Sequence, residues 1–175
     1  MKLLTLPLLL CAMIALSTAA DADEGHDVNK REAEEEKQLN KRSPYCPGGW
    51  ARHGRRCFFY FSHALTWAQA ERTCQVYGGN LASVHNVKHF KWLHRYVHSK
   101  THSRTVVWIG GYNIPQYGYW FWSDGKPFRY ASWCAGHPVN NGIQNCIRLS
   151  DTGCSRCMDT ANCFYQHPFV CVRRK

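Results

Sequence analysis

Histidines at helical spacing are the first residues of this sequence that suggest chemistry. His94, His98 and His102 recur every fourth residue, and His85 and His89 form another pair with this spacing. Imidazoles placed in this way on a helix can share a zinc ion. No His-Glu-X-X-His pattern accompanies them, and His102 is expected beyond the end of the helix. We therefore favour a solvated face that gains charge in acid, since the ordinary pKa of histidine is about 6.5.

Cysteine is the second residue type with chemical potential. The chain has ten cysteines, and those after residue 42 are Cys46, Cys57, Cys74, Cys134, Cys146, Cys154, Cys157, Cys163 and Cys171. In an exported protein, cysteines at this density indicate disulfides. Because nine is an odd number, one cysteine is expected to bridge a second molecule or to remain a reactive thiol.

Catalytic chemistry finds little support in the sequence. Four Asp or Glu residues follow residue 42, which leaves few groups for acid-base work. No Gly-X-Ser-X-Gly, P-loop or dinucleotide motif occurs in the chain. We therefore predict that the protein is not an enzyme.

Two segments precede the cysteine-rich part. Residues 1–20 contain one charged residue, a long apolar run and a small-residue end, which predicts a signal peptide and a secreted, extracellular protein. Residues 21–42 contain eight acidic and five basic residues and end in Lys41-Arg42. Such a segment buries too little apolar surface to fold alone. We interpret it as an acidic propeptide cleaved after Arg42; the alternative is an acidic linker with an incidental basic pair.

Residues 43–175 are strongly basic, with 16 Lys or Arg residues against four Asp or Glu residues. Net charge informs about partners more than about fold. We expect anionic partners, such as sulfated or sialylated glycans and bacterial or cell surfaces. No nucleic-acid-binding motif accompanies the charge, so nucleic acid is not an expected partner.

Two helices are predicted to position these side chains. Residues 66–77 begin with Thr66 and Gln69 at capping-box spacing and end before two glycines. Residues 86–98 form the second predicted helix, in which Phe90, Leu93 and Val97 are expected to be buried. Its expected outward face comprises Lys88, Lys91, His94, Arg95 and His98.

Short strands are predicted after the helices. Residues 106–109, 119–122, 146–149 and 169–172 are rich in β-branched and aromatic residues and are bounded by Gly, Pro, Asn or Asp. Residues 43–175 have the length of one ordinary domain with one core.

Seven blocks in a characteristic order extend over this domain. They are Cys46-Pro47-Gly48-Gly49-Trp50, Cys57-Phe58-Phe59-Tyr60, Thr66-Trp67-Ala68-Gln69-Ala70, Gly79-Asn80-Leu81-Ala82-Ser83-Val84-His85, Trp108-Ile109-Gly110-Gly111, Trp120-Phe121-Trp122-Ser123-Asp124-Gly125 and Phe169-Val170-Cys171. With these blocks, residues 43–175 resemble a C-type lectin-like domain. The resemblance implies an α+β fold in which two helices flank short antiparallel sheets, with a long loop region and disulfide staples.

The signal peptide and the Ser132-Trp133-Cys134 block are most similar to the secreted fish group of type II antifreeze proteins and mucus or venom lectins. The acidic leader on a basic domain also resembles eosinophil major basic protein. Family pairing implies the disulfides Cys46–Cys57, Cys74–Cys171 and Cys146–Cys163, and the antifreeze-like subgroup implies Cys134–Cys157. Cys154 is then unpaired. A homodimer linked through Cys154 is favoured over a capped monomer or a different pairing.

The sugar site of this family is built on a calcium ion. This sequence has His137-Pro138-Val139 where the family carries Glu-Pro-Asn or Gln-Pro-Asp, and Gln144 stands at the place of a glutamate. Asp159 is the one carboxylate left, and shifting the alignment by one residue does not restore the other ligands. Because calcium takes six to eight oxygen ligands, we expect no calcium and no other cofactor.

Polar residues in the loop can still bind a sugar without the ion. The expected ligand-binding residues are His137, Pro138, Asn140, Asn141, Gln144, Asn145, Asp159 and Thr160, with Trp133 or a neighbouring tyrosine as a stacking face. The alternative is that these polar residues only shape the loop.

Three functions are compatible with these observations. The favoured one is a secreted, calcium-independent, dimeric lectin that recognises cell-surface or microbial glycans in innate defence. The second is a cationic antimicrobial or cytotoxic effector released from its acidic propeptide. The third is an ice-binding protein of the type II antifreeze kind.

Overall fold

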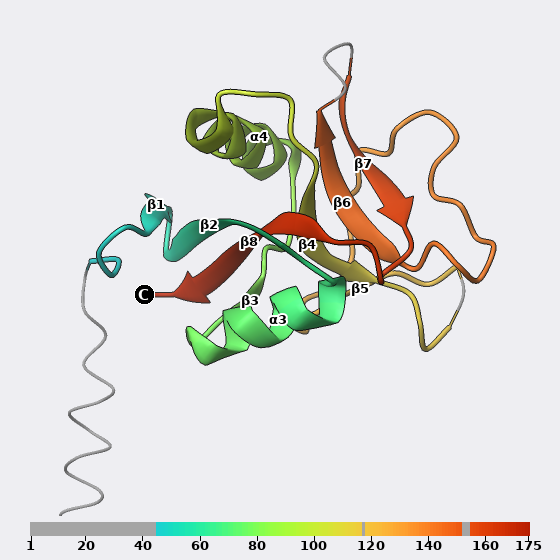
Figure 1. Cartoon of the computed structure of the whole chain (residues 1–175), viewed down its shortest axis with the longest axis horizontal. Helices are drawn as coiled ribbons and strands as arrows, with labels where there is room; N and C mark the ends of the chain where they lie inside the picture. The colour runs from blue at the N-terminus through green and yellow to red at the C-terminus, as the bar shows by residue number, and fades with distance from the viewer. Residues whose placement is uncertain (1–44, 117, 152–154) are drawn as a thin grey trace, which may run out of the picture. The chain divides into compact units, whose positions relative to one another are not determined.

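The computed structural model describes residues 45–175 except 117 and 152–154. Within this part the elements, labelled in Figure 1, are β1 (Ala51–His53), β2 (Arg56–Leu65), α3 (Trp67–Val76), β3 (Asn80–Leu81), α4 (Val87–Thr101), β4 (Val107–Tyr112), β5 (Phe121–Trp122), β6 (Cys146–Asp151), β7 (Arg156–Ala161) and β8 (His167–Arg174). The predicted signal peptide, the predicted propeptide with Lys41-Arg42, and Cys154 lie outside the described residues. No helix in the described part is long and apolar enough to cross a membrane.

Both predicted helices are present; the capping box predicted for α3 is confirmed, and α4 also has a side-chain cap. In α3 the Thr66 side chain accepts a hydrogen bond from Gln69 N, and the Gln69 side chain accepts one from Thr66 N. In α4 the Asn86 side chain accepts from His89 N. α4 continues three residues beyond the predicted end, to Thr101, and is closed by His102 in a left-handed conformation with φ 51°.

The interpretation of the α4 histidines as a solvated face is wrong for two of them. His89 and His94 are buried, whereas His98 is exposed as predicted. The helical period explains the error, because positions 89 and 94 flank the apolar stripe of Phe90, Leu93 and Val97. Among the described residues no group of three potential metal ligands is found, so the imidazoles of α4 do not gather around a common point.

The strands form one eight-stranded sheet. Its order is β1-β2-β8-β4-β6-β7, with β3 added beside β8 and β5 beside β4. The pairs are antiparallel except β4 with β8, which is parallel at Trp108 and Phe169. The predicted α+β fold, with two helices and short antiparallel strands, is confirmed, and the β4–β8 contact joins its two antiparallel ladders into one sheet.

The sequence missed four of these strands. β2 and β7 are long. The last part of β2 contains Ser62-His63-Ala64, which does not alternate like a typical strand, and β7 reads Arg-Cys-Met-Asp-Thr-Ala, without a run of β-branched residues. β1 and β3 are two or three residues long. β2 and β3 are formed by pairing with β8, β7 by pairing with β6, and β1 by pairing with β2. Such pairing leaves little signal in the local sequence.

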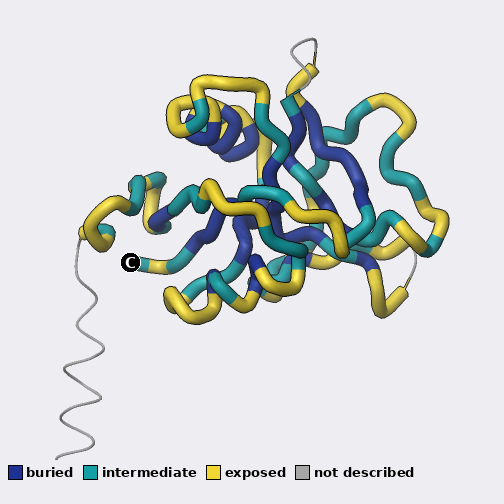
Figure 2. Tube along the Cα trace, in the orientation of Figure 1, coloured by how far each residue is buried: buried dark blue, intermediate teal, exposed yellow. Residues whose placement is uncertain are grey.

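Each helix covers its own hydrophobic cluster. α4 packs Phe90, Leu93 and Val97 into a cluster that contains Ile109 and Trp122. α3 contributes Ala70 and Cys74 to a second cluster, which contains Trp108 and Phe169. The buried backbone is concentrated in the central strands between the two helices, whereas the loops that follow β5 are more exposed (Figure 2).

Four disulfides join these layers, with the pairing that the resemblance implied. They are Cys46–Cys57, Cys74–Cys171, Cys134–Cys157 and Cys146–Cys163. Cys74–Cys171 links α3 to β8 across 97 residues of sequence. Cys134–Cys157 attaches the long loop between β5 and β6 to the sheet, and Cys146–Cys163 attaches the turn after β7. Both bonds lie next to the site described below.

Candidate functional site

A cleft of about 380 Å³ opens where the long loop between β5 and β6 meets β7. Its lining residues are His137, Val139, Ile143, Gln144, Arg148, Thr160, Ala161, Asn162 and Tyr165. Three of the predicted ligand-binding residues are thus brought together: His137, Gln144 and Thr160. Pro138, Asn140, Asn141, Asn145 and Asp159 do not line the cleft.

Backbone pairing and a disulfide hold the first half of the loop against β7. Met158 N donates to Ser132 O at 2.6 Å, and Cys134 N donates to Met158 O at 2.9 Å. The Cys134–Cys157 disulfide joins the same two segments covalently. The loop then passes through the cis peptide bond between His137 and Pro138. This part of the loop is therefore fixed relative to the strand that forms the floor of the cleft.

Thr160 is the centre of the polar network in the cleft. Its N–H donates to His137 Nδ1 at 3.0 Å, and its hydroxyl accepts from Val139 N at 3.1 Å. The hydroxyl also lies 2.9 Å from His137 Nδ1 and donates to Gln144 Oε1 at 3.4 Å. Because a backbone N–H can only donate, Nδ1 is an acceptor and the ring proton is on Nε2. His137 Nε2–H and the Gln144 amide have no hydrogen-bond acceptor among the described residues.

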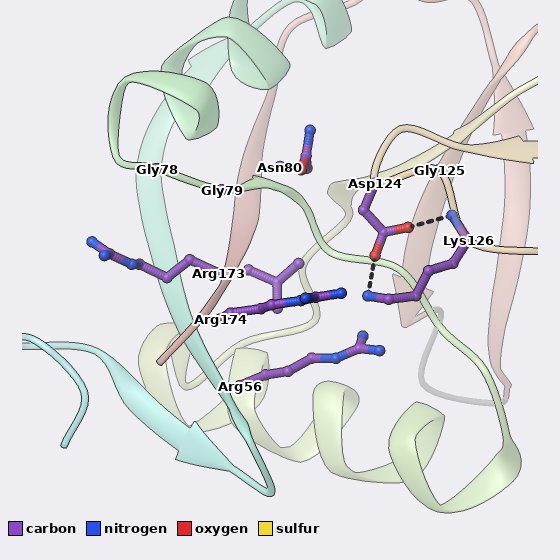
Figure 3. A pocket seen from close by; sticks show the side chains of 10 residues that line it. Arg56, Gly78, Gly79, Asn80, Asp124, Gly125, Lys126, Arg173 and Arg174 are labelled. Atoms are coloured by element: carbon purple, nitrogen blue, oxygen red, sulfur yellow. Dashed lines mark hydrogen bonds and ion pairs between the residues drawn. The ribbon is translucent and has the colours of Figure 1, made fainter. Parts of the chain in front are cut away.

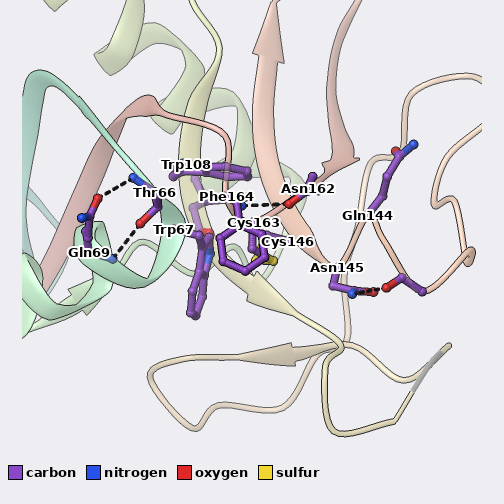
Figure 4. Close-up of a disulfide and its surroundings, with 12 residues drawn as sticks. Thr66, Trp67, Gln69, Trp108, Gln144, Asn145, Cys146, Asn162, Cys163 and Phe164 are labelled. Carbon is purple, nitrogen blue, oxygen red and sulfur yellow. Dashed lines mark hydrogen bonds between the residues drawn. A yellow bond between two sulfur atoms is a disulfide. The ribbon is translucent and has the colours of Figure 1, made fainter.

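The asparagines of the loop have a structural role. Asn141 Oδ1 accepts from Ile143 N and Gln144 N, each at 3.0 Å, and so forms the turn that carries Gln144. Asn145 Nδ2 donates to Gly142 O at 2.8 Å, as drawn in Figure 4. Asn140 is exposed outside the cleft. For Asn141 and Asn145 the structure favours the alternative in which polar residues shape the loop.

Asp159 is bound by an arginine and does not face the cleft. Arg148 Nε donates to Asp159 Oδ1 at 2.8 Å, and Arg148 Nη2 donates to Oδ2 at 2.9 Å. Arg148 Nη1 lies 3.1 Å from His167 Nε2. Burial, together with the nearby Arg148 guanidinium, lowers the pKa of His167. The guanidinium thus lines the cleft, whereas the carboxylate is held behind it.

These residues do not fit a calcium ion. Calcium takes six to eight oxygen ligands, several of which are carboxylates. Here the nearest carboxylate is Asp159, and both of its oxygens accept hydrogen bonds from Arg148. A divalent cation in this place would also be repelled by the guanidinium beside it.

The sequence reasoning missed two lining residues in the turn after β7. Asn162 Oδ1 accepts from Phe164 N at 2.9 Å, and Asn162 O accepts from Tyr165 N at 3.0 Å. The Cys146–Cys163 disulfide attaches this turn to the start of β6 (Figure 4). The Asn162 side-chain amide and the Tyr165 ring, which is 58% exposed, are therefore presented beside the long loop.

Tyr165 takes the place that sequence reasoning gave to Trp133. Trp133 packs against Trp120 and Phe128, with ring centroids 5.4 and 6.2 Å apart, and does not line the cleft. The neighbouring-tyrosine alternative is the one that the geometry favours. An exposed aromatic ring beside several side-chain amides and an imidazole N–H suits a ligand that has both a nonpolar face and hydroxyl groups.

This chain is similar to known proteins over most of its length. Residues 63–173 match the family described as Lectin C-type domain. Type-2 ice-structuring protein of Hemitripterus americanus is 38% identical over 171 residues, covering 97% of this chain and 98% of that protein. Ladderlectin of Oncorhynchus mykiss is 38% identical over 148 residues, covering 81% of this chain and 78% of that protein. Among solved structures, a calcium-independent type II antifreeze protein matches with a TM-score of 0.67 and 32% identity, over 77% of this chain and 98% of that chain.

Proposed function

This chain belongs to the Lectin C-type domain family and has the C-type lectin fold, and we propose that it is a secreted, calcium-independent carbohydrate-binding protein. The sugar binds in the cleft between the long loop and β7. The observation that carries the proposal is the bidentate Arg148–Asp159 pair, in which both oxygens of the carboxylate are already bound. The similarity to ladderlectin, a lectin by name, supports sugar as the ligand class.

The lining groups of the cleft are mainly hydrogen-bond donors. Gln144 Oε1 already accepts from Thr160, and Asn162 Oδ1 already accepts from Phe164 N, so the N–H groups of both amides are free to donate. His137 Nε2–H adds a third donor. Sugar ring oxygens and hydroxyls accept from these groups, while the Tyr165 ring packs on the nonpolar face of the sugar. Because Arg148 is paired with Asp159, the two residues add no net charge to the cleft, which suits a neutral sugar.

The wider setting follows from the ends of the domain and from its cysteines. Residues 1–20 direct secretion, and cleavage after Arg42 removes an acidic propeptide. A Cys154–Cys154 bond joins two domains, so that two weak sites act together on one surface. Bacterial or cell surfaces, which display many copies of a glycan, are the partners that such a dimer suits in innate defence.

A glycan array probed with the secreted protein tests this proposal. We expect binding to a subset of glycans that a free sugar competes away. Tyr165→Ala should weaken this binding roughly tenfold, since stacking on the ring is lost. Tyr119→Ala is the matched control, because Tyr119 is 62% exposed and does not line the cleft. Equal binding by both variants would contradict the proposed cleft.

Ice binding is a second candidate function. It is favoured by the 38% identity to a type-2 ice-structuring protein over 97% of this chain. A surface rich in Arg, Lys and His is a poor match to an ice plane, because these charged groups are strongly hydrated. Thermal hysteresis of the purified protein decides this question: a measurable freezing-point gap would support ice binding, and none is expected.

A further inference from the structure

A second cleft, of about 530 Å³, lies at the end of the sheet where β2 and β8 pair. Its lining residues are Arg56, Gly78, Gly79, Asn80, Asp124, Gly125, Lys126, Val172, Arg173 and Arg174, as Figure 3 shows. Four of these side chains are cations and one is a carboxylate. None of these residues lines the sugar cleft, so the two sites are separate.

Two arginines of this cleft stand directly opposite each other. Arg56 on β2 and Arg174 on β8 are register partners in the antiparallel ladder. Like charges in this relationship repel each other. In Figure 3 both side chains extend in the same direction, toward Lys126, whereas Arg173 extends away from them. Burial lowers the pKa of Arg56; the nearby Asp124 carboxylate opposes this shift, and the charge of Arg174 adds to it.

The carboxylate of the cleft favours the charge of Arg56 but forms no ion pair with Arg56 or Arg174. Asp124 Oδ2 accepts from Lys126 Nζ at 2.7 Å and from Ser83 Oγ at 2.6 Å, and Asp124 Oδ1 accepts from Lys126 N at 3.2 Å. The Asp124 side chain is 8% exposed. Asp124 therefore neutralises Lys126. The two arginines remain without an anionic partner in the cleft.

The guanidinium groups keep most of their donors free. Arg56 Nη1 donates to Ser83 Oγ at 3.4 Å. Within the described part of the chain, the Arg174 guanidinium donates no hydrogen bond to the protein. Two guanidinium groups with free donors on one side match the oxygens of a tetrahedral anion, which arginine binds in a bidentate manner.

The opposite wall of the cleft is backbone. A Cβ atom at Gly79 would lie 2.2 Å from Val172 O, so only glycine allows this segment to approach β8 so closely. The wall is completed by Asn80, whose side-chain amide donates to Glu71 Oε1 at 2.6 Å. The wall is therefore polar and close to the arginines, and it has little side-chain bulk.

From these observations we propose that this cleft binds the sulfate group of a sulfated saccharide. The sulfate lies between the guanidinium groups of Arg56 and Arg174, and the sugar hydroxyls face the Asp124 carboxylate and the glycine backbone. A saccharide fits better than a nucleic acid, because no aromatic residue lines the cleft to stack on a base. A saccharide is also a better match than a membrane surface, because Val172 is the one residue with an apolar side chain among those that line the cleft.

Calorimetric titration of the secreted protein with a fully sulfated heparin tetrasaccharide tests this site. We expect saturable binding at physiological ionic strength and no binding of the same tetrasaccharide after chemical desulfation. Arg174→Gln should weaken binding at least about tenfold, since a charge-assisted pair is lost. Arg104→Gln and Arg129→Gln remove equal charge from exposed arginines outside the cleft and should change the dissociation constant less than about twofold.

Several outcomes would overturn the inference. Equal weakening by Arg174→Gln and by the controls would mean that total charge, not this cleft, binds the saccharide. Equal binding of the desulfated saccharide would exclude sulfate recognition. Stronger competition by single-stranded DNA or by phosphatidylserine vesicles would assign the cleft to another class of ligand.

A second measurement keeps the inference testable if the Arg174 variant folds poorly. In ¹H–¹⁵N spectra of the unmutated protein, the tetrasaccharide should shift the amide signals of Gly78, Gly79 and Gly125. The amides of Gln144 and Tyr165, at the sugar cleft, should not move. Shifts confined to the sugar cleft would contradict a separate sulfate site.

Discussion

Arg148 on β6 and Asp159 on β7 are register partners, and the guanidinium of one binds both carboxylate oxygens of the other, at 2.8 and 2.9 Å. This pair decides the chemistry of the sugar cleft. It occupies both oxygens of the carboxylate on the strand that carries Thr160, so that this carboxylate is not free to bind a cation. The proposal that the site works without calcium depends mainly on this Arg148–Asp159 pair.

Breaking the pair should destabilise the fold. Arg148→Ala leaves the nearly buried Asp159 without its partner, which should lower the free energy of unfolding by about 3 kcal/mol. Arg156→Ala is the matched control, because Arg156 pairs with Asp151 at 3.4 Å and its side chain is 54% exposed. That change should cost about 0.5 kcal/mol. Denaturant unfolding without reductant measures both variants, and similar losses would contradict the assigned difference.

Thr160 should matter for both stability and sugar binding. Thr160→Val removes the hydroxyl that accepts from Val139 N and contacts His137 and Gln144, so it should cost about 1–2 kcal/mol and weaken sugar binding. Thr160→Ser keeps the hydroxyl and should restore binding. Glycan titration of the two variants tests the network. Binding by Thr160→Val that equals binding by Thr160→Ser would show that the network does not position the site.

Acid should destabilise the protein through two histidines of α4. Burial, aided by nearby cations such as Arg56, lowers the pKa of His89 to about 3. Burial also lowers the pKa of His94 to about 4; nearby Asp151 opposes this shift and Arg156 adds to it. In the unfolded chain both groups take up a proton near pH 6.5. The unfolded state therefore binds more protons between these values, and stability should fall as the pH is lowered from about 6.5 toward 4.

His94→Leu isolates this effect. Removing a buried imidazole whose Nε2 has no hydrogen-bond partner in the described structure should flatten the acid dependence of the unfolding free energy. His98→Leu, which changes an exposed residue one turn later, is the matched control. Unfolding curves at several pH values compare the variants. If the unfolding free energy of His94→Leu depended on pH as steeply as that of the unmutated protein, this explanation would be contradicted.

Two disulfides should have different effects on sugar binding. Replacing Cys134 and Cys157 by serine frees the loop from β7 and should cost about 3 kcal/mol of stability, together with most of the sugar affinity. Replacing Cys46 and Cys57 should lower stability but leave sugar binding intact, because that bond lies at β1 and β2. Sugar titration below the unfolding temperature of each variant separates these effects.

Residues whose local signal agreed with the fold could be predicted from the sequence. Thr66 and Gln69 cap α3 as their spacing indicated. The resemblance to the family implied three of the four disulfides of the described residues, and the antifreeze-like subgroup implied Cys134–Cys157. The position of the sugar loop was predicted, and so were His137, Gln144 and Thr160 as a set; their role as ligand-binding residues is part of the proposal.

Residues that depend on tertiary pairing could not be predicted. Asp159 appeared free in the sequence because nothing local places Arg148 opposite it. Tyr165 and Asn162 were missed because the turn after β7 reaches the loop only through the sheet and the Cys146–Cys163 bond. The burial of His94 was missed because its side chain lies at the edge of the apolar stripe of α4. There the polarity of histidine indicates an exposed residue, whereas its position on the helix indicates a buried one.

Titration of the strongest array glycan in calcium and in EDTA tests the central claim most directly. We predict the same dissociation constant in both buffers, because Arg148 already binds both oxygens of Asp159, the carboxylate that a calcium ion would need. Loss of binding in EDTA, restored by added calcium, would contradict it.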